Sequence, residues 1–302
     1  MFHNLKKIIP KLQSKFIFDY DIANHTWFKV GGKADLFCIV KDEKELEIIL
    51  NNIHIETPIF VIGAGSNVLV RDGGFKGLII KLGKSFNLLN IENEFISVGS
   101  SILDSNLSKF AFNNSLKGFE FFSGIPGSVG GAIKMNAGCY GFETSNILKE
   151  VHIFNKKAEK KILKNKDLKL AYRHSNLLDT DIVTSVLFKG EYGDKKDIES
   201  KITEIKFKRE NSQPLKYKTG GSTFKNPKNQ FAAKLIEESD CKGLVVGNAM
   251  VSKKHSNFLI NMGNAKAEDL ENLGNIVQEK VMKKSKIFLE WEIKIIGQNF
   301  GK

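Results

Sequence analysis

Two glycine-rich segments in the first half of the chain have the composition of loops that bind an anion. The first is Gly63-Ala64-Gly65-Ser66-Asn67, and the second is Gly124-Ile125-Pro126-Gly127-Ser128-Val129-Gly130-Gly131-Ala132. Both combine glycine with serine and carry no charged side chain. Successive backbone N–H groups in such turns form a concave nest for phosphate oxygens. Together the two segments predict a dinucleotide cofactor whose two phosphates are bound without a metal ion.

Better-known nucleotide motifs do not fit the first segment. Val68 occupies the place of the third glycine of a Rossmann fingerprint, and no Gly-Lys-Ser/Thr closes the segment as in a P-loop. A tight turn without a ligand is the alternative for both segments. The sequence has no H-E-x-x-H, no aspartate-rich magnesium motif and no Cys/His cluster, so we expect no metal site.

The positive charge of the chain is almost entirely lysine. Lys and Arg together number 46, yet arginine occurs only at Arg71, Arg173 and Arg209. Arg173 lies between Tyr172 and His174. A guanidinium donates two parallel hydrogen bonds to a carboxylate, which a lysine ammonium cannot do. We therefore expect Arg173 to bind or polarise a carboxylate, with a surface ion pair as the alternative. The sequence leaves the roles of Arg71 and Arg209 open.

Ser222 is the hydroxyl best placed for proton chemistry. It follows a glycine pair, Gly220-Gly221, in a segment flanked by Lys218 and Lys225. No G-x-S-x-G elbow surrounds it, so an acyl-transfer nucleophile is disfavoured. A proton donor or a hydrogen bond to substrate fits better, and an ordinary serine turn is the alternative.

Other polar residues in the last third are weaker candidates. Glu290 and Glu292 share the polar side of an expected strand, where carboxylates usually face solvent. His255 and Asn257 stand out only because polar residue types occur close together in the segment 251–258. The pattern alone gives neither pair a role.

Alternating strand and helix patterns surround the glycine segments and indicate a mixed α/β or α+β fold. Strands are expected at Ala34–Val40, Ile59–Ile62, Leu78–Leu82, Phe95–Val98, Ile182–Phe188 and Phe288–Ile296. Asp42 and Glu45 predict a capping box at the start of a helix. Apolar spacing predicts further helices near 103–111, 199–208, 231–236 and 270–281. We interpret the polar stretch Lys189–Lys196 as a linker.

Composition narrows the class of protein. Hydrophobic residues make up 41% and aromatic residues 10%, which excludes wholesale disorder. The formal net charge is +12, but nucleic-acid binders gain most from arginine, so a lysine-rich solvated surface is favoured over a nucleic-acid interface. Three cysteines without a C-x-x-C pair argue against disulfides and fit a reducing compartment. No signal peptide and no apolar stretch of about 20 residues is found, so we expect a cytoplasmic protein.

Seven motifs, in order along the chain, resemble the UDP-N-acetylenolpyruvoylglucosamine reductase (MurB) family. They are NHTWFKVGGKA (24–34), GAGSN (63–67), GFEFFSGIPGSVGGAIKMNAGCYG (118–141), YR (172–173), GGSTFKNP (220–227), VSKKHSNFLIN (251–261) and LEWEIKIIG (289–297). GIPGSVGGA and GSTFKNP are the most specific of them. The segment around YR has little room for the extra tyrosine-bearing lid of longer members, which indicates the compact subtype. Which group closes over the substrate is therefore left open.

The resemblance implies an α+β flavoenzyme. It implies an FAD-binding domain of the vanillyl-alcohol-oxidase (PCMH) type with a small N-terminal lobe (1–85), a second FAD-binding lobe (86–195) and a C-terminal α+β substrate domain (196–302). NADPH would reduce bound FAD, which would then reduce UDP-N-acetylglucosamine enolpyruvate to UDP-N-acetylmuramate in peptidoglycan precursor synthesis. The UDP-sugar is the expected partner of a monomer that binds neither nucleic acid nor membrane. Another flavin oxidoreductase on the same fold is the alternative.

The resemblance also implies roles for individual residues. Arg173 would stabilise the negative charge that develops on the substrate, together with Glu292, and Glu290 is the less favoured of the two carboxylates. Ser222 would protonate the resulting carbanion. The cofactor would be held by the two glycine segments, apart from Val129. Tyr172, Lys225 and Asn226 are expected to bind the UDP-sugar.

Overall fold

The computed structural model describes residues 1–300, which form two compact units. The larger unit holds Met1–Phe18, Leu36–Ala64 and Gly77–Lys208, and the smaller unit holds Asp19–Asp35, Gly65–Lys76 and the chain from Arg209 onward. Neither unit is one contiguous stretch, because the chain passes from one to the other several times. The division into three parts at residues 85 and 195 stays a prediction.

A four-stranded sheet lies mostly in the larger unit. Its order is β1 (Lys15–Asp21), β2 (Lys33–Val40), β5 (Phe75–Leu82) and β3 (Ile59–Val61), with β3 parallel to β5. The helices of this region are α1 (His3–Ile8) and α2 (Glu43–Asn51). Apolar side chains of β2, β5 and α2, among them Leu36, Leu46 and Ile80, form one buried cluster. The strands predicted around residues 34–40, 59–62 and 78–82 are confirmed.

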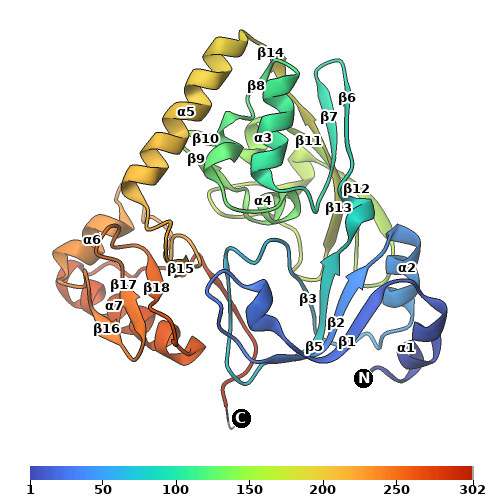
Figure 1. The fold of residues 1–302 in the computed structure, drawn as a ribbon, viewed down its shortest axis with the longest axis horizontal. Coiled ribbons are helices and arrows are strands. Elements are labelled where there is room, and N and C mark those ends of the chain that lie inside the picture. Colours follow the sequence, from blue (N-terminus) through green and yellow to red (C-terminus); the bar gives the residue numbers. More distant parts are fainter. Residues whose placement is uncertain (301–302) are drawn as a thin grey trace. The chain divides into compact units, whose positions relative to one another are not determined.

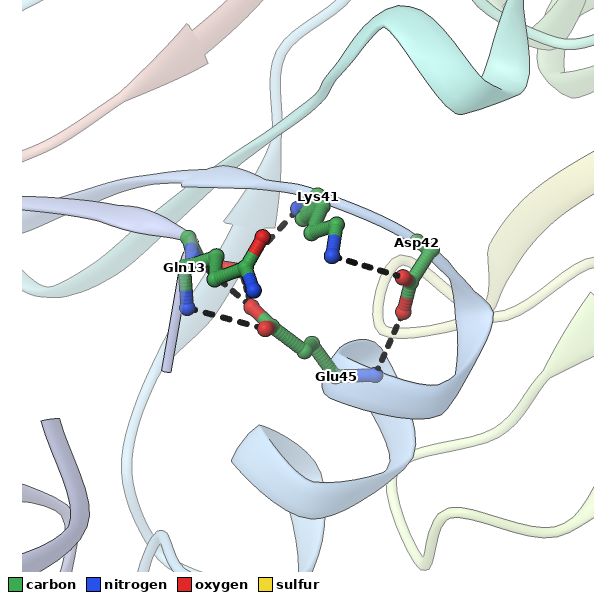
Figure 2. Close-up of polar contacts among 5 residues, drawn as sticks. Gln13, Lys41, Asp42 and Glu45 are labelled. Carbon is green, nitrogen blue, oxygen red and sulfur yellow. Dashed lines mark hydrogen bonds and ion pairs between the residues drawn. The ribbon is translucent and has the colours of Figure 1, made fainter. Parts of the chain in front are cut away.

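The start of α2 differs from the predicted capping box. Asp42 does cap the helix, because its carboxylate accepts the N–H of Glu45 at 2.9 Å. The carboxylate of Glu45 instead accepts the N–H of Gln13 at 2.9 Å and both the N–H and the hydroxyl of Ser14, at 2.7 and 2.5 Å (Figure 2). Burial raises the pKa of Glu45, but these hydrogen bonds outweigh it and hold the pKa below its usual value. Glu45 therefore fastens the segment before β1 to α2.

A five-stranded antiparallel sheet forms the rest of the larger unit. Its order is β12 (Lys160–Lys164), β11 (Leu148–Phe154), β13 (Ile182–Lys189), β7 (Phe95–Gly99) and β6 (Leu89–Glu92). The helix α4 (Val129–Met135) packs against β13 and β7, and α3 (Asp104–Asn113) packs against the short turn Glu120–Gly124 (Figure 1). The second glycine segment runs directly from that turn into α4, so the core of this unit fixes both of its ends.

The stretch Lys189–Lys196 is paired rather than an open linker. Lys189 ends β13, and β14 (Glu191–Tyr192) pairs with β8 (Leu116–Lys117). The helix predicted near 199–208 is confirmed and is longer, as α5 (Lys195–Ser212). A second short pair, β9 (Gly138–Cys139) and β10 (Phe142–Glu143), follows α4.

The smaller unit is built on a four-stranded antiparallel sheet. Its order is β15 (Lys218–Thr219), β18 (Leu259–Asn261), β17 (Ala249–Val251) and β16 (Val245–Val246). The helix α7 (Ala267–Ser285) packs on β16, β17 and β18, and α6 (Ala232–Glu238) packs on α7 (Figure 1). Within residues 1–300 no helix is both long and apolar enough to cross a membrane.

The last predicted strand is shorter than expected. Only β19 (Lys294–Ile296) is a strand, and it pairs in parallel with β4 (Val68–Val70). The residues before it pair with a different partner: Trp291 forms a bridge with Phe224, and Lys225 donates its N–H to the carbonyl of Glu290 at 2.9 Å. Because the segment changes partners midway, the predicted alternation over 288–296 does not hold as one strand.

Candidate active site

The two glycine segments meet inside the larger unit. A Cβ atom at Gly63 would lie 2.2 Å from Oγ of Ser128, so the loop after β3 touches the second segment and a larger residue there would force the Ser128 hydroxyl to move. Backbone hydrogen bonds also hold the second segment against residues 102–104. The N–H of Val129 donates to the carbonyl of Ile102 at 2.9 Å, and the backbone N–H of Asp104 donates to the carbonyl of Gly127 at 3.1 Å. The structure thus brings together Gly63 and Ser128, which the sequence placed in separate motifs.

This junction offers free donors to an anion. Within residues 1–300, the N–H groups of Gly63, Ala64, Gly127 and Ser128 donate to no protein acceptor. Lys81 lies beside them, with its ammonium donating to the carbonyl of Gly63 at 3.0 Å. Free N–H groups next to a cation are the donor set that phosphate requires.

The remaining members of the second segment differ in their burial and backbone contacts, and their part in binding a cofactor stays a prediction. Ala132 is buried in the core of the larger unit and donates its N–H to the carbonyl of Ser128 at 2.9 Å. Gly130 donates to the carbonyl of Ser100 at 2.9 Å, and Gly124 packs beneath Ile205. Ile125, Pro126 and Gly131 stay partly or fully exposed.

The other end of the first segment lies in the smaller unit. Gly65 has φ +69°, and a Cβ atom there would lie 1.8 Å from the carbonyl oxygen of His25. Ser66 lies near Gly221, with 3.9 Å between its carbonyl oxygen and the place of a Cβ atom at Gly221. Asn67 donates its side-chain amide to the carbonyl of Glu292 at 2.9 Å. Asn67, which is predicted to bind the cofactor, therefore also holds the backbone of Glu292, a predicted catalytic residue.

Arg173 lies in a tight turn of the larger unit. Ala171 and His174 exchange two backbone hydrogen bonds, of 3.1 and 3.0 Å, and Arg173 between them has φ +53°. Its Nη2 donates to the carbonyl of Gly138 at 2.8 Å, and its guanidinium carbon lies 5.0 Å from the centre of the Tyr172 ring. A guanidinium with one edge bonded and one face on a ring has a fixed direction, which suits it to orient a carboxylate.

Ser222 and Glu292 lie on adjoining segments of the smaller unit. The carbonyl of Thr223 accepts the N–H of Glu292 at 2.8 Å, so the residue after the serine is bonded directly to the glutamate. Ser222 is half-buried, and its hydroxyl makes no hydrogen bond within the described residues. A hydroxyl in that state can donate to a ligand at no cost to the fold.

The predicted substrate residues after Ser222 are partly engaged in the fold. Lys225 is paired with Glu290 at 3.4 Å, and the side chain of Glu290 is 70% exposed. The side-chain oxygen of Asn226 accepts the N–H of Ala232 at 3.0 Å, at the start of α6. Tyr172 is exposed.

Family models match two segments of the chain. The model "FAD binding domain" matches residues 34–160, and the model "UDP-N-acetylenolpyruvoylglucosamine reductase, C-terminal domain" matches residues 213–296. The chain is 43% identical to UDP-N-acetylenolpyruvoylglucosamine reductase of Caulobacter vibrioides over 296 residues, which are 97% of this chain and 98% of that protein. It belongs to the UDP-N-acetylenolpyruvoylglucosamine reductase family. The reductase of Rickettsia rickettsii (strain Sheila Smith) is 41% identical over 292 residues, 97% of this chain and 99% of that protein.

A solved structure agrees with this family. The crystal structure of UDP-N-acetylenolpyruvylglucosamine reductase (MurB) from Thermus caldophilus is 34% identical, with a TM-score of 0.82 over 94% of this chain and 99% of that one. The predicted family and the predicted fold, an α+β protein with an FAD-binding domain of the PCMH type, are confirmed. The chain is therefore an FAD-dependent oxidoreductase of the UDP-N-acetylenolpyruvoylglucosamine reductase family.

Three residues that hold parts of the candidate site were missed in the sequence. Asp104 is fully buried next to Gly127, and burial raises the pKa of its carboxyl well above the usual value. Asn136 is fully buried after α4 and donates to the carbonyl of Ala171 at 3.0 Å, which holds the turn of Arg173. Lys81 is the third. All three act through partners distant in sequence, so no local pattern could reveal them.

Proposed function

We propose that this chain reduces UDP-N-acetylglucosamine enolpyruvate to UDP-N-acetylmuramate with NADPH, in peptidoglycan precursor synthesis. The observation that carries the proposal is the match, over 97% of the chain, to UDP-N-acetylenolpyruvoylglucosamine reductases. The geometry of the smaller unit supports it, because the backbone N–H of Glu292 donates to the carbonyl of Thr223, the residue after Ser222, whose hydroxyl has no hydrogen-bond partner within the described residues.

The residues present fit FAD. The N–H groups of Gly63, Ala64, Gly127 and Ser128 would hold its pyrophosphate, with Lys81 adding positive charge. Burial raises the pKa of the Asp104 carboxyl beside the loop, which favours its uncharged form and would lessen repulsion of the phosphates. When bound, FAD supplies the hydride that adds to the vinyl CH₂ carbon of the substrate. NADPH is the proposed source of that hydride.

The proposed work of the chain itself is charge stabilisation and proton transfer. Addition of hydride builds negative charge on the neighbouring carbon and on its carboxylate. Arg173, directed by Gly138 and Tyr172, would stabilise this charge with two hydrogen bonds, and Glu292 would assist. Ser222 would give its proton to the carbanion, which completes the addition of one hydride and one proton across the double bond. The serine would then regain a proton from water.

Substrate binding is proposed for three residues near these groups. Tyr172 stays exposed beside Arg173, and Lys225 and Asn226 follow Ser222 by three and four positions. Lys225 is the best placed of the three to meet a UDP phosphate, because its ammonium has a single, largely exposed carboxylate partner.

Two half-reactions test the proposal. The purified protein, reconstituted with FAD without oxygen, should lose its flavin absorbance on addition of NADPH and regain it on addition of UDP-N-acetylglucosamine enolpyruvate. UDP-N-acetylmuramate should be found by mass spectrometry. A flavin that NADPH reduces but the enolpyruvyl compound cannot reoxidise would overturn the proposed substrate. Reoxidation by oxygen with turnover of an alcohol would favour an oxidase on the same fold.

A further inference from the structure

Asn257 belongs to the motif of residues 251–261 and has no role in the site described so far. Its side chain is buried, with 4% of the residue exposed. Its Oδ1 accepts the N–H of Phe224 at 2.9 Å, and its Nδ2 donates to the carbonyl of Phe224 at 2.7 Å. Its own carbonyl accepts the N–H of Thr223 at 2.8 Å. One residue thus holds three backbone groups immediately after Ser222.

The same backbone also holds Glu292. Thr223 accepts the N–H of Glu292 through its carbonyl at 2.8 Å, and its hydroxyl accepts the N–H of Leu259 at 3.2 Å. Thr223 is fully buried and Phe224 is 1% exposed, so water cannot replace these partners. The position of Thr223 therefore depends on Asn257 and fixes both Ser222 and Glu292.

Only an amide matches both backbone groups of Phe224. A carboxylate would place an acceptor against the carbonyl of Phe224, and a serine would be too short to reach both groups. An apolar residue would leave a buried N–H and a buried carbonyl without partners.

We propose that Asn257 is a positioning residue for the protonation step. Its side-chain amide fixes the backbone of Phe224, and its main-chain carbonyl fixes that of Thr223, so that Ser222 and Glu292, which flank this backbone, are held in place. The inference rests on the proposed function, because it takes Ser222 as the proton donor. A misplacement of about 1 Å in a reacting group can cost on the order of a hundredfold in rate.

A control of the same residue type lies at the end of β18. Asn261 is also 4% exposed, and its amide donates to the carbonyl of Phe28 at 2.8 Å and accepts the N–H groups of Gly263 and Ala265 at 2.7 and 3.1 Å. Asn257→Ser removes two side-chain hydrogen bonds and Asn261→Ser removes three, so we expect the control to lose at least as much stability. Only the first variant disturbs the backbone after Ser222.

The test compares half-reactions at a temperature where all variants are folded and bind FAD. Asn257→Ser should keep the rate of flavin reduction by NADPH, slow reoxidation by the enolpyruvyl substrate by about 100-fold, and increase the solvent deuterium isotope effect on that step. Asn261→Ser should keep both rates. A normal reoxidation rate in Asn257→Ser, or equal slowing in both variants, would overturn the proposal.

Ser222→Ala, measured in parallel, separates this inference from the proposed function. If reoxidation of the unaltered protein by the substrate fails, the proposed function is wrong. If that reaction works and Ser222→Ala reoxidises normally, the role of Ser222, and with it that of Asn257, is wrong. A slow Ser222→Ala beside a normal Asn257→Ser rejects the positioning role alone.

Discussion

The guanidinium of Arg71 binds the carboxylate of Glu271 through two hydrogen bonds. Nε donates to Oε2 at 2.8 Å and Nη2 donates to Oε1 at 2.7 Å, while Nη1 donates to the carbonyl of Gly297 at 3.1 Å. Arg71 follows β4, Glu271 lies on α7 and Gly297 follows β19. One side chain therefore joins three elements of the smaller unit, which gives a structural role to an arginine whose task the sequence left open.

Arg71→Lys should lower the free energy of unfolding by about 1–2 kcal/mol, because an ammonium cannot form the two parallel bonds and also reach Gly297. Denaturant unfolding of the FAD-bound protein measures the change. Lys242→Met removes an exposed ion pair with Glu237 and should change stability much less, because water and salt screen exposed ion pairs. Equal losses of unfolding free energy in the two variants would show that the two parallel hydrogen bonds from Arg71 to Glu271 contribute no more than an exposed ion pair.

Gly63→Ala should weaken FAD binding, because the added methyl carbon would meet Oγ of Ser128 at 2.2 Å and force this hydroxyl to rotate within the proposed phosphate site. The flavin-to-protein absorbance ratio after gel filtration measures the loss. Adding Ser128→Gly to the same chain removes the colliding hydroxyl and should recover part of the bound flavin. Full flavin in Gly63→Ala would show that the Ser128 hydroxyl can move away without loss of binding, which contradicts the prediction.

Arg173→Lys should slow flavin reoxidation by the enolpyruvyl substrate by about 100-fold and leave flavin reduction by NADPH unchanged. Lysine keeps the charge but loses the planar fork and the bond to Gly138. Stopped-flow absorbance of each half-reaction measures both rates. Reoxidation at the normal rate would mean that a simple positive charge is sufficient.

Asp104→Asn should change how stability depends on pH. The pKa of Asp104 is raised in the folded state, so above its ordinary value of 3.8 the folded protein binds more protons than the unfolded chain. The contribution of Asp104 to stability is therefore complete below about pH 4 and falls as pH rises toward its folded pKa. The variant has no such loss, so its stability relative to the unaltered protein should increase as the pH rises above about 4, at about 1.4 kcal/mol per pH unit at most.

Chemical unfolding of both proteins at several pH values, with FAD removed, tests this prediction. A difference in stability that stays constant across the range would mean that Asp104 is already ionised in the folded state.

The local sequence pattern was sufficient to predict an element when its structure depends on residues that are near in sequence. The strands β2, β5 and β7 and the helices α5 and α7 follow from apolar spacing, because each buries one face or one run of side chains. The glycine segments are recognisable because tight turns and close approaches require glycine itself.

Only the tertiary structure shows which contacts form between residues that are far apart in the sequence. The carboxylate of Glu45 binds Gln13 and Ser14 instead of the nearer backbone of its own helix, and the last predicted strand is divided between Phe224 and β4. Sequence alone could select Ser222, Arg173 and Glu292 by residue type and resemblance. It could not show that Asn257 pairs with Phe224, because a buried amide is satisfied by whichever backbone the fold places against it.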